Sequence, residues 1–201
     1  ARMVRGQGSL LWDEAGARYL DFIQGWAVNA LGHAPEVVTR AVSAQLGQVI
    51  NVGPAHHNTL APALAEALCA ASGMARVFFT CSGVEANEGA VKLARKWGQR
   101  HRAGAHAVIT TFDGFHGRTL AMTCATGKPG FDRAFPPAVE GFPKVPYGDL
   151  NAVARAIDGR TVGVMVEPVQ GEAGVVMPPE GYLRGLRALC DRAGILLIAD
   201  E

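Results

Sequence analysis

From Arg76 onward, the chain alternates short apolar runs with longer segments whose apolar residues recur at helical spacing. The runs Val162–Val166 and Ile195–Ile198 carry no charged or polar side chain, as expected of strands buried on both faces. This alternation is typical of an α/β fold with a mostly parallel sheet and helices on both faces. Strands are predicted at 76–80, 106–111, 119–124, 162–167 and 195–199, and helices at 84–101, 149–157 and 180–193.

The first part of the chain has a different rhythm. Residues 4–23 read as short strands with a hairpin turn at Asp13–Gly16. Apolar spacing then predicts one helix that starts at Pro35 and runs to Leu46, and a second over Leu60–Ala71. Two segments read as loops, 53–58 and the Gly-, Pro- and Phe-rich stretch 127–148.

Composition excludes several classes of protein. The 201 residues are 49% hydrophobic and 18% charged, with a net charge of +1, so neither a nucleic-acid surface nor a basic membrane patch is expected. The four cysteines lack CxxC spacing, which argues against a zinc site and a dense disulfide framework and favours reduced thiols in the cytoplasm. No apolar run is long enough to cross a bilayer, and the first residues lack the pattern of a signal peptide. Because the chain lacks an initial Met and stops directly after a strand-like run, we expect it to be a fragment.

The turn Ser82-Gly83-Val84 lies between an apolar run and a helical pattern. A small-residue turn into a helix leaves N–H groups free at the positive end of the helix dipole, which favours a phosphate. Ser82 with Glu85 three residues later is also a capping box, which would satisfy such donors without any ligand. These residues alone leave both interpretations open.

Further polar or aromatic residues follow predicted strands. Glu167 and Asp200 come directly after two apolar runs, and Phe115 and Arg118 lie between two other predicted strands. Ligands of open α/β sheets bind beyond the carboxyl ends of the strands, so one pocket could gather these groups. A phosphate cradle, an aromatic plate, a cation and a carboxylate together suit a planar, phosphorylated ring that contains nitrogen. Pyridoxal phosphate meets this description, because its ring nitrogen needs a carboxylate partner.

Four motifs occur along the chain in the order Phe79–Glu88, Phe115–Leu120, Val166–Gly174 and Leu197–Glu201. Together they make the chain resemble the class III pyridoxal-phosphate aminotransferases, in particular their acetylornithine and ornithine branch. The likeness covers nearly all of the 201 residues. It implies a fold-type I α/β fold, with residues 1–52 as part of a small domain and residues 53–201 as an incomplete large cofactor-binding domain.

The resemblance also implies site roles. Ser82, Gly83 and Val84 would hold the cofactor phosphate, Gly83 and Val84 largely through their backbone N–H groups. Relatives commonly have Thr or Ala in place of Val84, a difference that keeps the backbone donor but not a hydroxyl contact. Phe115 would stack on the cofactor ring, and Asp200 would pair with the ring nitrogen. Each residue also has a structural alternative, such as a helix cap, a core aromatic or a turn former.

Three more residues are assigned by the resemblance alone. Glu201 would line the cofactor pocket beside Asp200, and Arg118 would bind the substrate carboxylate. Glu172 resembles the family glutamate that pairs with a substrate-binding arginine found later in the chain. His116 is interpreted as structural, and no metal ligands are expected.

The implied activity is transfer of an amino group from N-acetylornithine, or a similar ω-amino donor, to 2-oxoglutarate, as in arginine biosynthesis. The implied protein is a cytoplasmic homodimer. No catalytic residue is assigned within the chain, because the lysine that forms a Schiff base with the cofactor would lie beyond Glu201. The alternatives are another class III ω-aminotransferase, an aminomutase, or a non-catalytic relative that binds the cofactor. On the first reading, the fragment itself would be inactive.

Overall fold

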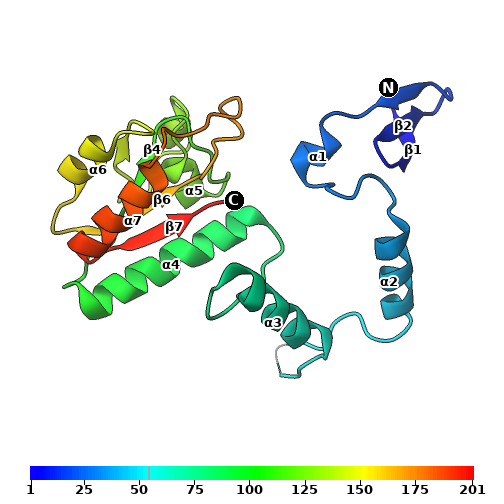
Figure 1. Cartoon of the computed structure of the whole chain (residues 1–201), viewed down its shortest axis with the longest axis horizontal. Coiled ribbons are helices and arrows are strands. Elements are labelled where there is room, and N and C mark those ends of the chain that lie inside the picture. The colour runs from blue at the N-terminus through cyan, green and yellow to red at the C-terminus, as the bar shows by residue number, and fades with distance from the viewer. Residues whose placement is uncertain (54) are drawn as a thin grey trace. The chain divides into compact units, whose positions relative to one another are not determined.

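The computed structural model describes residues 1–53 and 55–201, so Pro54 of the predicted loop 53–58 lies outside the described residues. The chain divides into two compact units, Ala1–Val77 and Phe78–Glu201 (Figure 1). The domain boundary expected between residues 52 and 53 stays a prediction, because compactness alone does not define a domain.

A small antiparallel sheet opens the first unit, in the strand order β1 (Met3–Gln7), β2 (Leu10–Asp13) and β3 (Arg18–Leu20). Its second turn is closed by the carboxylate of Asp13. Oδ1 accepts the N–H groups of Ala15 at 3.0 Å and Ala17 at 2.9 Å, and the Tyr19 hydroxyl donates to Oδ2 at 2.7 Å. The hydrogen bond from Tyr19 is the main cause that lowers the pKa of Asp13. The predicted hairpin turn is confirmed.

Three helices complete the first unit: α1 (Gln24–Ala27), α2 (Glu36–Leu46) and α3 (Leu60–Ser72). The two longer helices match the predicted ones closely, although Pro35 caps α2 rather than opening it. None of the three contains a buried residue. The short helix α1 was not predicted, because its inner residues adopt left-handed backbone angles that apolar spacing does not reveal.

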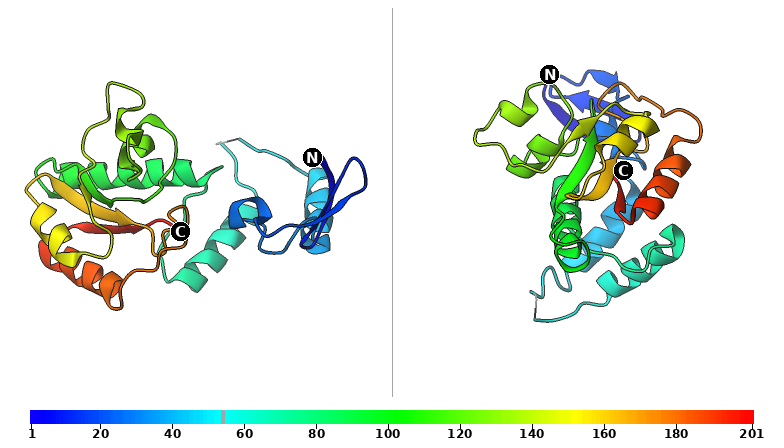
Figure 2. Two further views of the ribbon diagram at one scale, coloured as in Figure 1. Left: turned by 90° about the horizontal axis from the view of Figure 1, so that it is seen from above. Right: turned by 90° about the vertical axis from the view of Figure 1, so that its left-hand side faces the viewer.

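The second unit is built on a parallel sheet in the order β5 (Lys144–Val145), β4 (Ala107–Thr111), β6 (Thr161–Val166) and β7 (Leu196–Ala199). Helix α4 (Gly83–His101) lies on one face, and α6 (Leu150–Ala156) and α7 (Tyr182–Ala193) lie on the other (Figures 1 and 2). Two buried clusters, one on each side, hold the layers together. The predicted α/β class is confirmed, and its physical basis is the pair of central strands β4 and β6, which are mostly apolar and buried throughout.

Three local predictions are wrong. No strand forms at 76–80: no described residue pairs with this segment, and Phe78 stays 78% exposed. The segment predicted as a strand at 119–124 is helix α5 (Leu120–Ala125), because the Thr119 side chain caps it by accepting the N–H of Met122. The loop 127–148 contains β5 and a 3₁₀ turn at Phe131–Arg133.

The carboxyl ends of the parallel strands lie at one edge of the sheet, which positions the candidate site. Glu167 follows β6, Asp200 follows β7, and Phe115 lies four residues after β4. The N–H of Asp200 donates to the carbonyl oxygen of Val166 at 2.9 Å, which ties the two strand ends together. Residues far apart in sequence therefore meet because their strands are neighbours.

Candidate functional site

The N-terminus of α4 combines a capping box with unused donors. Ser82 Oγ accepts the N–H of Glu85 at 3.4 Å, and Glu85 Oε2 accepts the N–H of Cys81 at 2.8 Å. The backbone N–H groups of Gly83 and Val84 have no acceptor among the described residues. The cap therefore uses different donors from those that an anion would take, so the two interpretations of this turn are compatible.

A cavity of about 550 Å³ lies at this helix end. It brings together most of the predicted site residues, from three separate parts of the sequence. Its lining includes Ser82, Gly83, Val84, Phe115, Arg118 and Asp200, together with Asn87, His116, Gly117 and Thr119.

Two neighbouring side chains of the cavity hold the carboxylate of Asp200. Its Oδ2 accepts the side-chain amide of Asn87 at 2.7 Å and lies 2.8 Å from Nδ1 of the buried His116. Because an ionised carboxylate can only accept, Nδ1 of His116 carries the proton in this contact. Asn87 also donates to the backbone carbonyl of His116 at 2.9 Å, which locks the three residues together. No described residue donates to Oδ1, so this oxygen is available to a donor in the cavity.

Asn87 and His116 are functional candidates that the sequence did not reveal: Asn87 was not identified, and His116 was interpreted as structural. Asn87 is 6% exposed and His116 is 2% exposed. A polar residue at a buried helical position is rare unless it has a partner, so Asn87 within the small-residue face of α4 could have drawn attention. The partner itself lies 113 residues away, and only the sheet brings the two together.

The backbone of Phe115 is fixed by a second carboxylate. Its N–H donates to Glu167 Oε2 at 2.9 Å. Tyr147 in turn donates its hydroxyl to the carbonyl oxygens of Glu167 and Pro168, each at 3.0 Å. Burial raises the pKa of Tyr147 to about 12, so this hydroxyl remains a donor at neutral pH. The backbone of Phe115 is thus held by the residue that follows β6 as well as by its own loop.

Glu167 leads to a pH prediction. Its pKa is raised, chiefly by burial, although the bond from Phe115 N–H acts in the opposite direction. A carboxyl with a raised pKa in the folded state contributes stability that is lost as pH rises from its unfolded pKa through its folded pKa. We therefore expect Glu167→Gln, which keeps an acceptor for Phe115, to gain stability relative to the parent as pH rises through this window. Urea unfolding at several pH values measures this, with Glu180→Gln at an exposed position as control. A constant difference across the window would contradict it.

The three remaining predicted site residues are Arg118, Glu201 and Glu172, and they lie in three different cavities. Arg118 is exposed at the cavity, and its guanidinium makes no hydrogen bond to a described residue. Glu201 lines an adjoining cavity of about 480 Å³, which shares Phe115 and Asp200 with the first. Glu172 lies apart from both, in a cavity of about 500 Å³, where its carboxylate is 2.7 Å from Lys128 Nζ.

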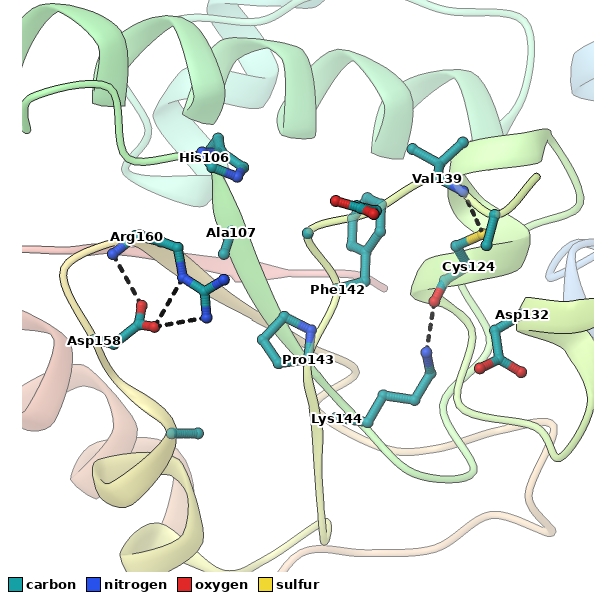
Figure 3. Close-up of a pocket in the computed structure, with 14 residues that line it drawn as sticks. His106, Ala107, Cys124, Asp132, Val139, Phe142, Pro143, Lys144, Asp158 and Arg160 are labelled. Carbon is teal, nitrogen blue, oxygen red and sulfur yellow. Dashed lines mark hydrogen bonds and ion pairs between the residues drawn. The ribbon is translucent and has the colours of Figure 1, made fainter. Parts of the chain in front are cut away.

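A further cavity of about 410 Å³ lies at the opposite ends of β4 and β6, next to His106 and Arg160 (Figure 3). Lys144 reaches across it to donate to the carbonyl oxygen of Cys124 at 2.6 Å, and burial lowers the pKa of this amine. It contains none of the predicted site residues. Among residues 1–53 and 55–201, no cluster of His, Cys, Asp and Glu could hold a metal ion. No helix in the described part of the chain is long and apolar enough to cross a membrane.

Comparison with known proteins finds similar proteins along the whole chain. The family model described as Aminotransferase class-III matches residues 1–201. "Acetylornithine aminotransferase 2" of Bordetella pertussis is 56% identical over 198 residues, which cover 98% of this chain and 50% of that protein. The chain thus spans about half the length of the curated relatives it matches.

Solved structures give the same picture. The ornithine aminotransferase of Toxoplasma gondii ME49 superposes with a TM-score of 0.94 at 30% identity, over 98% of this chain and 48% of that one. An amine transaminase from an uncultivated Pseudomonas species, solved in its PLP-bound form, gives 0.90 at 30% identity over 100% and 51%.

Proposed function

Because the chain belongs to the class III aminotransferases, we propose that the full-length protein carrying it transfers an amino group from N-acetylornithine, or a similar ω-amino donor, to 2-oxoglutarate. The observation that supports this most directly is the cavity that joins the α4 N-terminus, Phe115 and Asp200. The names of the relatives support the choice of donor. Family resemblance further leads us to propose a cytoplasmic homodimer.

The family implies pyridoxal phosphate, and the donor set of the cavity fits this cofactor. Two unused N–H groups, of Gly83 and Val84, suit a phosphate at the positive end of a 19-residue helix. At the same cavity, Asp200 Oδ1 suits a protonated ring nitrogen, which needs a charged acceptor. When bound, the cofactor supplies an electron-withdrawing ring for the transfer of the amino group.

Each of the predicted site residues would then have a defined task. Ser82, Gly83 and Val84 would bind the phosphate, and Phe115 would cover one face of the ring. Asp200 would hold the proton on the ring nitrogen, while Asn87 and His116 keep its carboxylate oriented through Oδ2. Preorganised charge of this kind needs no rearrangement during the reaction.

The remaining tasks concern the substrate and the proton. Arg118 would bind the substrate carboxylate with its planar fork, and Glu201 would line the cofactor pocket. Glu172 would pair with a substrate-binding arginine, as the family resemblance implies. No lysine lines the cavity among the described residues. We therefore propose that the lysine bonded to the cofactor lies outside residues 1–201.

The test uses the full-length protein with added pyridoxal phosphate. After unbound cofactor is removed, we expect an absorbance band of the cofactor that stays with the protein, and glutamate formation from N-acetylornithine and 2-oxoglutarate. A cofactor band without transfer to any oxo acid would favour a non-catalytic relative. Transfer from other ω-amines but not from N-acetylornithine would favour another ω-aminotransferase. Absence of both band and transfer would overturn the proposal.

A further inference from the structure

The loop between β4 and α5 carries Arg118, and helix α4 contacts this loop at its first two turns. Val84 packs against Gly117, where an added Cβ would lie 2.3 Å from Val84 Cγ2. One turn further along α4, the side-chain amide of Asn87 donates to the backbone carbonyl oxygen of His116 at 2.9 Å. The part of the loop that precedes Arg118 is therefore held on α4 by packing and by a hydrogen bond.

Glu88, the next residue of α4, contacts the loop on the other side of Arg118. The hydroxyl of Thr119 donates to Glu88 Oε1. The oxygen of the same hydroxyl accepts the N–H of Met122 at 3.3 Å and thereby caps α5. Because a hydroxyl has only one proton, donation to Glu88 leaves its lone pairs for the N–H of Met122. Glu88 thus orients Thr119 for the first turn of α5.

The bond between Glu88 and Thr119 has no part in the site roles described so far. Both residues are partly buried, and Thr119 is the only hydrogen-bond partner of the Glu88 side chain among the described residues. A hydrogen bond to an ionised carboxylate is stronger than one between neutral groups. Thr119 lines the candidate cavity and Glu88 does not, so Glu88 can influence a ligand only through the loop.

The backbone of Arg118 is therefore fixed on both sides, while its guanidinium is free. This side chain is exposed at the cavity and makes no hydrogen bond to a described residue. A planar guanidinium binds a carboxylate through two parallel hydrogen bonds only when the two groups are correctly aligned. Since misplacement of a binding group by about 1 Å can be costly, the backbone position of Arg118 matters for such a contact.

We propose that Glu88 is a positioning residue, which fixes the backbone of Arg118 through Thr119 and so aligns Arg118 with the carboxylate of the substrate. This inference rests on the proposed function. Without Glu88, the hydroxyl of Thr119 loses its acceptor and is free to rotate away from α5, so the loop after Arg118 has one contact fewer. The loss should fall on substrates that carry the carboxylate and spare those that lack it.

The main experiment compares two amino donors with the full-length holoenzyme. These are N-acetylornithine and N-acetylputrescine, which is the same molecule without its carboxylate. We expect Glu88→Ala to lower the ratio of their kcat/KM values by roughly tenfold, mainly through the KM for N-acetylornithine. General damage to the fold would lower both values alike. Glu88→Gln, which keeps an acceptor for Thr119, should retain most of the preference, and Glu180→Ala, at an exposed position, should leave it unchanged.

Variants of Thr119 test the same contact from the other side. Thr119→Val has a similar shape but no hydroxyl, so it should reproduce the effect of Glu88→Ala. Thr119→Ser keeps the hydroxyl and should keep the donor preference. In the double variant Glu88→Ala, Thr119→Val, the preference should fall no further than in either single variant, because both changes remove one and the same bond. Additive losses would overturn the proposed coupling.

A binding measurement tests the inference without turnover. N-acetylnorvaline has the carboxylate of N-acetylornithine but no amine that could react. In calorimetric titrations of the full-length holoenzyme, Glu88→Ala and Arg118→Ala should both bind it more weakly than the parent, by roughly tenfold for Glu88→Ala. Parent-like affinity and donor ratio in Glu88→Ala would overturn this inference alone. A parent that transfers no amino group from either donor would overturn the proposed function, and this inference with it.

Discussion

Replacing Asp200 with alanine is expected to lower the turnover of the full-length enzyme by about a hundredfold or more, the usual loss when one preorganised charge contact is removed. In the structure, Asp200 is the carboxylate whose Oδ2 is held by Asn87 and His116 while Oδ1 remains available. Alanine removes both functions and leaves the donors of Asn87 and His116 without their acceptor. We expect the cofactor to bind more weakly as well.

Steady-state kinetics and a cofactor titration measure the two effects separately. Asp200→Asn is the informative companion, because it keeps the size of the side chain and removes the charge. Asp191→Asn serves as the control, since Asp191 lies on the surface of α7 and pairs only with Arg187 among the described residues. A turnover of Asp200→Ala within a few-fold of the parent would remove Asp200 from its proposed role.

Gly117→Ala is expected to disrupt the candidate site by displacing Val84 at the N-terminus of α4. Gly117 has φ +128°, and a Cβ there would lie 2.3 Å from Val84 Cγ2 and 2.7 Å from Val84 Cβ. Overpacking of this kind costs roughly 1–3 kcal/mol, and a left-handed backbone angle adds roughly 1–2 kcal/mol for a residue with a Cβ. Because Val84 carries one of the two unused N–H groups, relief of the clash would displace the proposed phosphate cradle.

We therefore expect Gly117→Ala to lower the free energy of unfolding and to weaken cofactor binding together. Urea unfolding and a cofactor titration measure these effects. In the double variant Val84→Ala, Gly117→Ala, the clash with Cγ2 is gone, but the 2.7 Å contact with the Cβ at position 84 and the backbone strain remain, so only part of the cofactor affinity should return. Gly104→Ala is a control, because its φ is +86° but no atom lies within 4 Å of the added Cβ. Equal losses in Gly104→Ala and Gly117→Ala would contradict the steric explanation.

Several elements could be predicted from local patterns because local interactions determine them. Strands β4, β6 and β7 consist mostly of β-branched or aliphatic residues, and helices α4 and α7 show clear helical spacing. The strand predicted at 76–80 does not form, because residues with high β-propensity become a strand only where a neighbouring strand pairs with them. The strand predicted at 119–124 is a helix instead, because the side chain of Thr119 caps its first turn and apolar spacing in so short a run fits either conformation.

The sequence by itself determined the α/β class, the family and the residue types available for chemistry. It does so because apolar periodicity and short motifs are local properties of the chain. Only the tertiary structure decided which of these residues meet: Asn87 and His116 at Asp200, Glu167 at the Phe115 backbone, and Lys128 at Glu172. These contacts join residues 44 to 113 positions apart, and they arise from the order of neighbouring strands and from the packing of loops at one sheet edge. Spacing along the chain carries no record of that arrangement.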